Sequence, residues 1–326
     1  WILSTFYGWT PIQKTNTGKP VIDEIILTEI AQDGIPIAAD FAKCLDITKK
    51  LGMISQGTNA YLKLSTTAER IHHHCSVSCA THRCAHRNPN LAQVPSDERF
   101  RRLFVPTEGQ VLCGADLSGI ELRMLAHYLA RYDGGRYADI LLNGDIHQTN
   151  ADKIGISRRA VKTVTYAFLY GAGDLKLGQS FDKQLSDKEA RAKGKEIRAA
   201  YIDAIPGLAD LLSAIKTAGG RGYIKALDGR KILLDSPHKA LNFCLQSGAG
   251  VVAKRWLVIA NDMSKQFCCS QLGFIHDEIQ YEVDPEHGED LKFALELAAV
   301  QAGEYYKMRL PIAAEAKLGA NWAETH

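Results

Sequence analysis

Two aspartates, Asp116 and Asp277, each lie at the end of a short apolar run that predicts a buried strand. If those strands are neighbours in one sheet, two carboxylates meet at one place. Such a pair suits Mg²⁺, which prefers one or two carboxylates and takes water and substrate phosphates as its other ligands. Two such ions can activate an attacking oxygen and stabilise a leaving oxygen in nucleotidyl transfer. The alternative is that both aspartates are ordinary turn formers. Glu278 either adds a third carboxylate or faces solvent.

A second pattern with chemical potential is a run of residues spaced four apart, Arg158, Lys162, Tyr166 and Tyr170. On a helix, which the spacing predicts over 157–172, they form one gently winding stripe. In the functional interpretation the cations hold a triphosphate and a tyrosine ring packs on a sugar or base. In the alternative the tyrosines face a core and the basic residues are solvated. Gly171 follows, as is typical of a helix end.

Histidines and cysteines are concentrated between residues 72 and 86. Zinc uses such ligands, but the paired spacings of common structural zinc sites are missing, so a hydrated, partly basic loop is the favoured interpretation. The chain has 8 cysteines without a disulfide-framework pattern, which favours a reducing cytoplasm. The concentrated residues are His72, His73, His74, Cys75, Cys79, His82, Cys84 and His86.

Basic residues accumulate over 61–105, whereas the whole chain has a net charge of only +2. This stretch suits a phosphate backbone, although a solvated loop face is an equally good interpretation of the charges alone. The basic members are Lys63, Arg70, Arg83, Arg87, Arg99, Arg101 and Arg102, against Glu69, Asp97 and Glu98.

The composition is that of a globular protein, with 46% hydrophobic and 23% charged residues, and excludes intrinsic disorder. No apolar run of about 18 residues exists, so we expect no membrane partner. Trp1 is not a start methionine and no signal peptide follows it, which favours part of a longer chain.

Periodicity predicts the secondary structure of most of the chain. We expect residues 1–60 to form an irregular lead-in and then a helix. A strand at 111–115 should precede a helix that starts near Ser118. Two hairpins are expected, one around Asp228–Gly229 and one with its bend at 276–278. Further helices are expected over 186–203, 207–218, 238–265 and 287–305, before a last strand at 311–316.

In its ordered motifs the sequence resembles family A DNA polymerases, and is similar above all to the replicative polymerases of T-odd-like bacteriophages. The three main motifs are D-L-S-G-I-E-L-R at 116–123, R-R-A-V-K-T-V-T-Y-A-F-L-Y-G at 158–171 and H-D-E at 276–278. The others are N-P-N-L-A-Q-V-P at 88–95, N-G-D-I-H at 143–147, L-D-G-R-K at 227–231, L-N-F-C-L-Q-S at 241–247 and A-N-W-A at 320–323.

The resemblance implies an α+β, right-hand polymerase fold with an antiparallel palm sheet and mostly helical fingers. Residues 1–60 would be a remnant of the thumb and its connection, 61–127 the first part of the palm, 128–245 the fingers and 246–326 the second part of the palm. It also implies template-directed DNA synthesis in phage replication, in the cytoplasm of a bacterial host if a phage encodes the chain. The implied cofactors are two Mg²⁺ ions, which Mn²⁺ can replace, and the implied partners are primer–template DNA and deoxynucleotides.

The resemblance further implies a catalytic site. Asp116 and Asp277 would bind the metal with the backbone carbonyl of Leu117, and Glu278 would be a further catalytic carboxylate. Lys162 would contact the triphosphate and donate a proton to pyrophosphate. The implied nucleotide contacts are Arg158, Lys162, Tyr166, His147 and Glu121, with Glu121 blocking a 2′-hydroxyl and Tyr166 implying tolerance of dideoxynucleotides. The implied DNA contacts are Arg83, Tyr170, Asn242, Gln246, His276 and Arg230.

The sequence departs from the family in two respects. The family's T-G-R is Thr81-His82-Arg83, and a histidine there predicts either a strained positive φ or a strained close approach to the duplex. No exonuclease domain and little of a thumb are matched, so a processivity factor on the thumb would be lost. The alternatives are therefore a DNA-binding remnant with little or no activity, a phage-type RNA polymerase, which Glu121 disfavours, and a zinc-dependent module.

Overall fold

The computed structural model describes residues 1–11, 14–15, 17–182 and 185–326. The chain forms two compact units, which are described separately. The smaller comprises Trp1–His74 and His86–Leu91, and the larger comprises Cys75–Ala85 and Ala92–His326.

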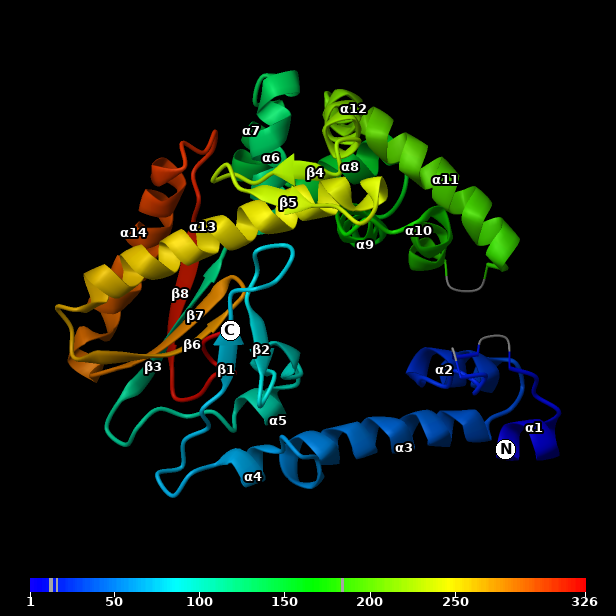
Figure 1. The fold of residues 1–326 in the computed structure, drawn as a ribbon, viewed down its shortest axis with the longest axis horizontal. Helices are drawn as coiled ribbons and strands as arrows, with labels where there is room; N and C mark the ends of the chain where they lie inside the picture. The colour runs from blue at the N-terminus through cyan, green and yellow to red at the C-terminus, as the bar shows by residue number, and fades with distance from the viewer. Residues whose placement is uncertain (12–13, 16, 183–184) are drawn as a thin grey trace. The chain divides into compact units, whose positions relative to one another are not determined.

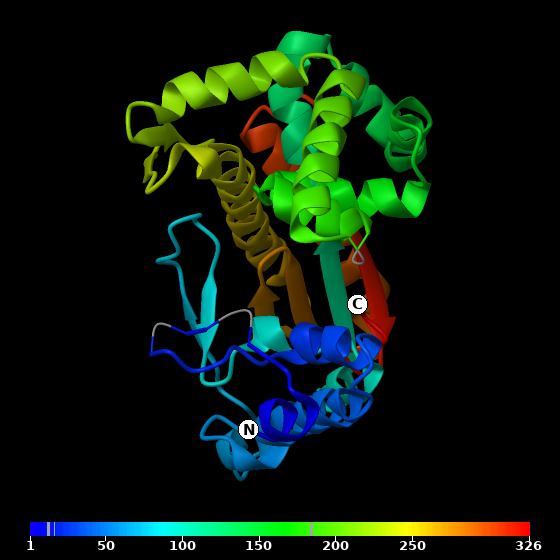
Figure 2. The same cartoon turned by 90° about the vertical axis from the view of Figure 1, so that its right-hand side faces the viewer.

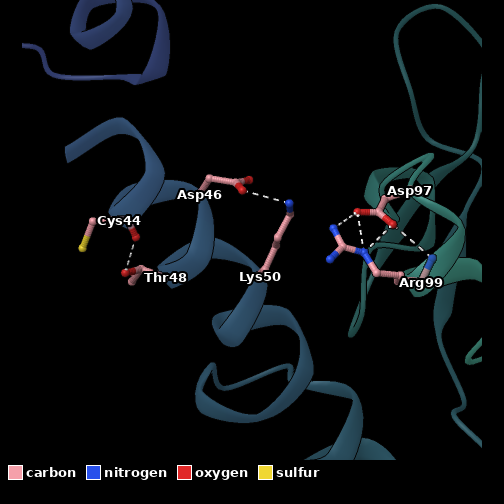
Figure 3. Close-up of polar contacts among 6 residues, drawn as sticks. All are labelled: Cys44, Asp46, Thr48, Lys50, Asp97 and Arg99. Carbon is pink, nitrogen blue, oxygen red and sulfur yellow. Dashed lines mark hydrogen bonds and ion pairs between the residues drawn. The ribbon is translucent and has the colours of Figure 1, made fainter. Parts of the chain in front are cut away.

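The smaller unit is helical. It contains α1 (Ile2–Tyr7), α2 (Glu24–Gln32), α3 (Ile37–Leu51) with the π-helical turn η1 (Gly52–Gln56), and α4 (Tyr61–Leu64). Its small core contains Leu3 of α1 and Leu27 of α2. The expectation of an irregular lead-in was wrong for α1 and α2, because α1 is very short and the apolar residues of α2 run consecutively and hide the helical period. Figure 3 shows the Asp46–Lys50 ion pair and the bond from Thr48 to the Cys44 carbonyl on α3.

The larger unit is built on a four-stranded antiparallel sheet in the order β6-β7-β3-β8 (Figure 1). The strands are β3 (Val111–Leu117), β6 (Cys269–Ile275), β7 (Glu278–Val283) and β8 (Ala314–Gly319). The central strands β3 and β7 therefore bring together two segments that lie about 160 residues apart in the sequence. The last strand begins later than the expected residue 311, because Pro311 has no N–H to donate to a ladder.

The two faces of this sheet differ. Alternate residues of β3, such as Cys113 and Ala115, are buried in the main apolar core with residues of α13 (Ala240–Ser264) and α14 (Gly288–Tyr305). The opposite face carries Asp116, which lies opposite Glu278 on β7 and Glu315 on β8. Since side chains alternate along a strand, one register keeps the apolar residues under the helices and the acids on the other face.

A group of helices lies beyond one end of the sheet, as Figures 1 and 2 show. Gly178 and Gly194 let α10 and α11 cross closely, since a Cβ on either would lie within 2 Å of a backbone oxygen of the other segment. The group comprises α6 (Ile120–Asp133), α7 (Arg136–Asn143), α8 (Ile146–Ile154), α9 (Arg158–Leu169), α10 (Asp174–Phe181), α11 (Asp187–Ala204) and α12 (Leu208–Gly219).

Shorter elements complete the chain. Asp97 caps α5 (Glu98–Arg101) and pairs with Arg99 (Figure 3). The hairpin expected around Asp228–Gly229 is confirmed as β4 (Tyr223–Lys225) and β5 (Lys231–Leu233). The remaining pieces are β1 (His74–Ser76), β2 (Ala85–Arg87), η2 (Leu91–Gln93), η3 (Pro237–Lys239) and η4 (Pro285–His287).

The long helices predicted by periodicity are confirmed, with ends displaced by a few residues. The helix with the cationic stripe stops at Leu169, and Gly171 follows with a φ of 76°. The helix after β3 starts at Ile120 rather than near Ser118. Along the described ranges, we find no helix of the length and apolar character that crossing a membrane requires.

Candidate active site

The structure brings Asp116 and Asp277 together. Asp116 is the penultimate residue of β3, and Asp277 lies in the turn between β6 and β7. The backbone N–H of Leu117 donates a hydrogen bond to the carbonyl oxygen of Asp277 at 2.9 Å. Burial, and next the charge of Asp277, raise the pKa of Asp116 to about 7. Burial, and next the charge of Glu121, raise the pKa of Asp277 to about 6.

These two carboxylates fit a divalent cation. A bound cation would neutralise the repulsion between these partly buried carboxylates. Carboxylate and carbonyl oxygens are also the ligand atoms that Mg²⁺ prefers. Among the described residues, no three or more His, Cys, Asp or Glu side chains are grouped so as to hold a metal ion, and this includes the loop at 72–86. A cation at the aspartates would therefore need further oxygen ligands, as Mg²⁺ takes from water and phosphates.

Glu278 is buried, with 4% of its surface exposed, so the solvent-facing alternative was wrong. Its carboxylate accepts hydrogen bonds from Gln280 Nε2 at 2.7 Å, from His326 Nδ1 at 2.9 Å and from the indole N–H of Trp322. Burial acts to raise the pKa of Glu278, but the bonds from His326 and Gln280 outweigh it and hold that pKa below its usual value. Both oxygens are thus engaged by the segment that follows β8 and by β7 itself.

Trp322 is itself fixed on three sides. Its backbone N–H donates to the Phe104 carbonyl at 3.0 Å, and the two rings meet edge to face with centroids 5.2 Å apart. The Arg101 guanidinium lies 5.4 Å from the indole centroid. The A-N-W-A segment therefore packs onto the acidic face of the sheet beside Asp116.

Glu121 forms the centre of a second cluster, in the first turn of α6. Its Oε1 accepts a hydrogen bond from Arg83 Nη2 at 2.6 Å and from the Tyr170 hydroxyl at 3.0 Å. Burial, and next the positive charge of Arg83, lower the pKa of His276. Because the charge of Glu121 also acts on Asp277, this cluster is continuous with the acid pair.

Tyr166 and Tyr170, the two aromatic residues of the stripe that begins on α9, lie near Glu121 and Asp277. Burial, followed by the charges of Glu121 and Asp277, raises the pKa of Tyr166. The side chain of Tyr170 reaches Glu121 and the residue is 46% exposed, so the tyrosines do not form a core-facing stripe. His147 on α8 lies beside Tyr166, with ring centroids 6.3 Å apart.

The basic end of the stripe begins where Ser157 caps α9. Burial is the main cause of the lowered pKa of His147, and the positive charges of Arg158 and Lys162 contribute to it. Arg158 Nε bonds Asp145 Oδ2 at 2.7 Å, and Asp145 also caps α8. The cations and the histidine therefore share one region.

Two of the predicted DNA contacts, Asn242 and Arg230, make local hydrogen bonds. Asn242 Nδ2 donates to the Leu169 carbonyl at 3.3 Å and so supports the end of α9. Gln246 lies about one turn further along α13 and is partly exposed. Arg230 Nε bonds Asp228 at 2.6 Å in the β4–β5 turn, and its positive charge acts on His82.

Sequence reasoning missed the partners of two of these residues, Arg158 and Glu278. Asp145 lies in the quoted N-G-D-I-H motif, and Trp322 in A-N-W-A, but neither was assigned a role. The bond from Arg158 to Asp145 and the bond from Trp322 to Glu278 join segments that are separated in the sequence. The two motifs could have indicated that Asp145 and Trp322 matter. Which residues they bond could be seen only in the folded structure.

The antiparallel sheet, with helices on one face and a helical group at one end, is the fold of a polymerase domain. A solved structure described as the POL domain of Pol1 from M. smegmatis in complex with DNA primer-template and dNTP superposes with a TM-score of 0.81, covering 99% of this chain and 60% of that chain at 24% identity.

The sequence model described as DNA polymerase family A matches residues 1–324, so the chain belongs to that family. The chain is 34% identical to a DNA-directed DNA polymerase of Enterobacteria phage T3 and 33% identical to one of Escherichia phage T7, over 98% of this chain and 50% of each relative. DNA polymerase I of Pseudomonas aeruginosa is 25% identical over 100% of this chain and 37% of its own length. The chain therefore spans half the length of the two phage relatives.

Proposed function

We propose that the chain is a template-directed DNA polymerase core that adds deoxynucleotides to a primer 3′ end. The observation that carries the proposal is the convergence of Asp116 and Asp277 beside Glu121 and the tyrosines of α9. Family membership and the primer-template and dNTP named for the structural relative support it.

Asp116, Asp277 and the backbone carbonyl of Leu117 would hold Mg²⁺, or Mn²⁺ in its place. When bound, the two metal ions supply activation of the attacking oxygen and neutralisation of the charge on the leaving pyrophosphate. Glu278 keeps its negative charge next to Asp116, because its donors hold its pKa low, and so adds to the attraction of this face for cations.

The nucleotide would lie along α9. Arg158, Lys162 and His147 would orient the triphosphate, and Lys162 would donate a proton to pyrophosphate as it leaves. The ring of Tyr166 would lie against the sugar, and the carboxylate of Glu121 would exclude a 2′-hydroxyl. Positioning and charge neutralisation would supply most of the catalysis, as expected for this type of transfer.

The DNA would be bound beside this site. Tyr170 would border the template base, and His276 would lie by the primer end. Duplex contacts, mainly in the minor groove, where geometry is read with little sequence information, would come from Arg83, Asn242, Gln246 and Arg230. The division into a thumb remnant (1–60), palm (61–127 and 246–326) and fingers (128–245) belongs to the same proposal.

Primer extension tests the proposal directly. We expect the chain to elongate a labelled primer on a template with Mg²⁺ and four deoxynucleotides, and the Asp277→Asn variant to bind the same DNA without elongating it. Elongation with ribonucleotides instead would identify an RNA polymerase. DNA binding by the wild-type chain without elongation would identify a binding remnant, and either result would overturn the proposal.

A further inference from the structure

The loop that carries Arg83 has an unusual backbone. His82, at the position where the family has glycine, has a φ of 59°, which confirms that the substitution places a side chain in the left-handed region. A residue with a Cβ is strained there, so other contacts must hold the peptide in place. Two residues of α13 provide them.

The first contact is a hydrogen bond. The ammonium group of Lys254 donates to the carbonyl oxygen of His82, and the bond is partly buried. A charged donor gives a stronger hydrogen bond than a neutral one, and partial burial reduces the competition from water. The lysine therefore fixes the orientation of the peptide between His82 and Arg83.

The second contact is a close approach at Gly250, about one turn before Lys254 on the same helix. A Cβ at this position would lie 2.8 Å from the carbonyl oxygen of His82, 3.0 Å from its carbonyl carbon and 3.2 Å from the backbone nitrogen of Arg83. All three are backbone atoms, so no side-chain rotation can relieve the crowding. Gly250 therefore leaves the space in which the peptide rests.

The peptide held in this way leads directly to Arg83. Its guanidinium bonds Glu121 at 2.6 Å, and the side chains of Arg83 and Glu121 are only 17% and 14% exposed. A shift of the preceding peptide would move the start of the Arg83 side chain and disturb this pairing. The contacts of Gly250 and Lys254 with the 82–83 peptide, which we call the seat on α13, thus determine the direction of the Arg83 side chain.

We propose that Gly250 and Lys254 are positioning residues that seat the 82–83 peptide on α13 and thereby aim Arg83 at the primer–template and at Glu121. This inference rests on the proposed function, in which Arg83 contacts the DNA. It explains how the chain accommodates a histidine at the turn: the helix supplies a space without a side chain and a cation for the carbonyl.

The test is the dissociation constant for a primer–template duplex, measured by fluorescence anisotropy without nucleotide. We expect Gly250→Ala and Lys254→Met each to raise this constant about three- to tenfold. Lys254→Met removes the hydrogen bond to the His82 carbonyl, and Gly250→Ala displaces the same peptide by steric crowding. Lys254→Arg should retain most of the affinity. The matched control is Lys265→Met at the end of α13, since Lys265 pairs only locally with Asp262 and is exposed. Equal losses in the control and in Lys254→Met would overturn the proposal.

A double-mutant cycle with Arg83→Ala separates positioning from direct contact. In the Arg83→Ala background, Gly250→Ala and Lys254→Met should add little further loss, because they act through the same side chain. Full additivity would show that Lys254 contacts the DNA itself, and would overturn the proposal. Hydrogen exchange of the 80–84 peptide should be faster in both variants than in the wild type, which reports on the seat without DNA.

The proposed function and the positioning role of Gly250 and Lys254 can fail separately. If the wild-type chain neither binds nor extends a primer–template, the proposed function fails, and the inference built on it fails with it. If the wild-type chain does both, and Gly250→Ala and Lys254→Met leave the dissociation constant and the exchange rate unchanged, only the positioning role fails.

Discussion

The backbone N–H of Leu117 and the backbone carbonyl of Asp277 are joined by a hydrogen bond of 2.9 Å. This bond ties the end of β3 to the turn between β6 and β7, and so it holds the two aspartates of the candidate site next to one another through the main chain. Removing either carboxylate leaves this bond in place. Substitutions at Asp116 and Asp277 therefore test chemistry with little risk to the fold.

Without metal, the contribution of Asp116 and Asp277 to the stability of the chain should fall as the pH rises. The pKa of Asp116 is raised to about 7 and that of Asp277 to about 6, against 3.8 for an unperturbed aspartate. The folded chain therefore keeps protons at these two carboxylates that the unfolded chain releases, and their contribution to the free energy of unfolding decreases from about pH 4 to about pH 7. Buried His127, whose pKa is lowered to about 4, acts in the opposite direction, so the measurement compares urea unfolding of the wild type and of Asp116→Asn in EDTA at pH 5 and pH 8. Mg²⁺ at pH 8 should stabilise the wild type by binding the folded form.

Asp116→Asn is the matched variant for that experiment. It removes the buried charge, so we expect the metal-free chain at pH 8 to gain about 1–2 kcal/mol of stability while primer extension is lost. Its response to Mg²⁺ should also shrink. A variant less stable than the wild type at pH 8 would contradict the assignment of repulsion at this site.

Glu121 is expected to act through both its size and its charge, and two substitutions separate them. Glu121→Gln keeps the volume but weakens the bonds from Arg83 and Tyr170, so it should lower primer–template affinity while still rejecting ribonucleotides. Glu121→Ala should also admit them, which raises the ratio of ribonucleotide to deoxynucleotide kcat/KM about tenfold or more. Equal ratios in the two variants would count against a steric role.

Tyr166→Phe removes one hydroxyl from the face that is expected to lie on the nucleotide sugar. Without that polar group, a nucleotide lacking its 3′-hydroxyl has no substitute partner, and we expect dideoxynucleotide incorporation to fall about tenfold relative to deoxynucleotide incorporation. Competition between the two nucleotides in single-base extension measures the ratio. An unchanged ratio of dideoxynucleotide to deoxynucleotide incorporation would show that the Tyr166 hydroxyl does not contact the nucleotide sugar.

Trp322→Phe keeps an aromatic ring against Phe104 but removes the N–H that bonds Glu278. Leaving this buried carboxylate with one donor fewer should cost about 1–3 kcal/mol in the free energy of unfolding and lower kcat for extension. The control is Trp256→Phe, in which the lost indole bond goes to the Leu295 carbonyl at 2.8 Å in the apolar core. The control should lose stability without a comparable loss of kcat, and equal effects on kcat would argue that Trp322 has only a structural role.

The sequence predicted the elements that depend on local pattern. Apolar runs predicted strand ends at Asp116 and Asp277, and the structure shows that the two strands are neighbours. The four-residue spacing predicted the stripe on α9. The loss of glycine at His82 predicted either a positive φ or a close approach to the duplex, and the structure shows the positive φ.

What the sequence did not show depends on tertiary contacts. Glu278 is surrounded by residues from the segment after β8, and no periodicity connects that segment with β7. Lys254, which bonds the His82 carbonyl, lies far along the chain in a helix that the sequence predicted without indicating this partner. The roles of the site residues in catalysis and DNA binding remain predictions for the experiments above.

The alternation along β3 has a further consequence for how this chain can change. Inserting or deleting one residue between Val111 and Ala115 would move each following side chain of the strand to the other face of the sheet. Asp116 would then point into the helix-covered core, and an apolar neighbour would take its place on the acidic face of the sheet. The pairing of Asp116 with Glu278 and Glu315 therefore depends on the exact length of this strand.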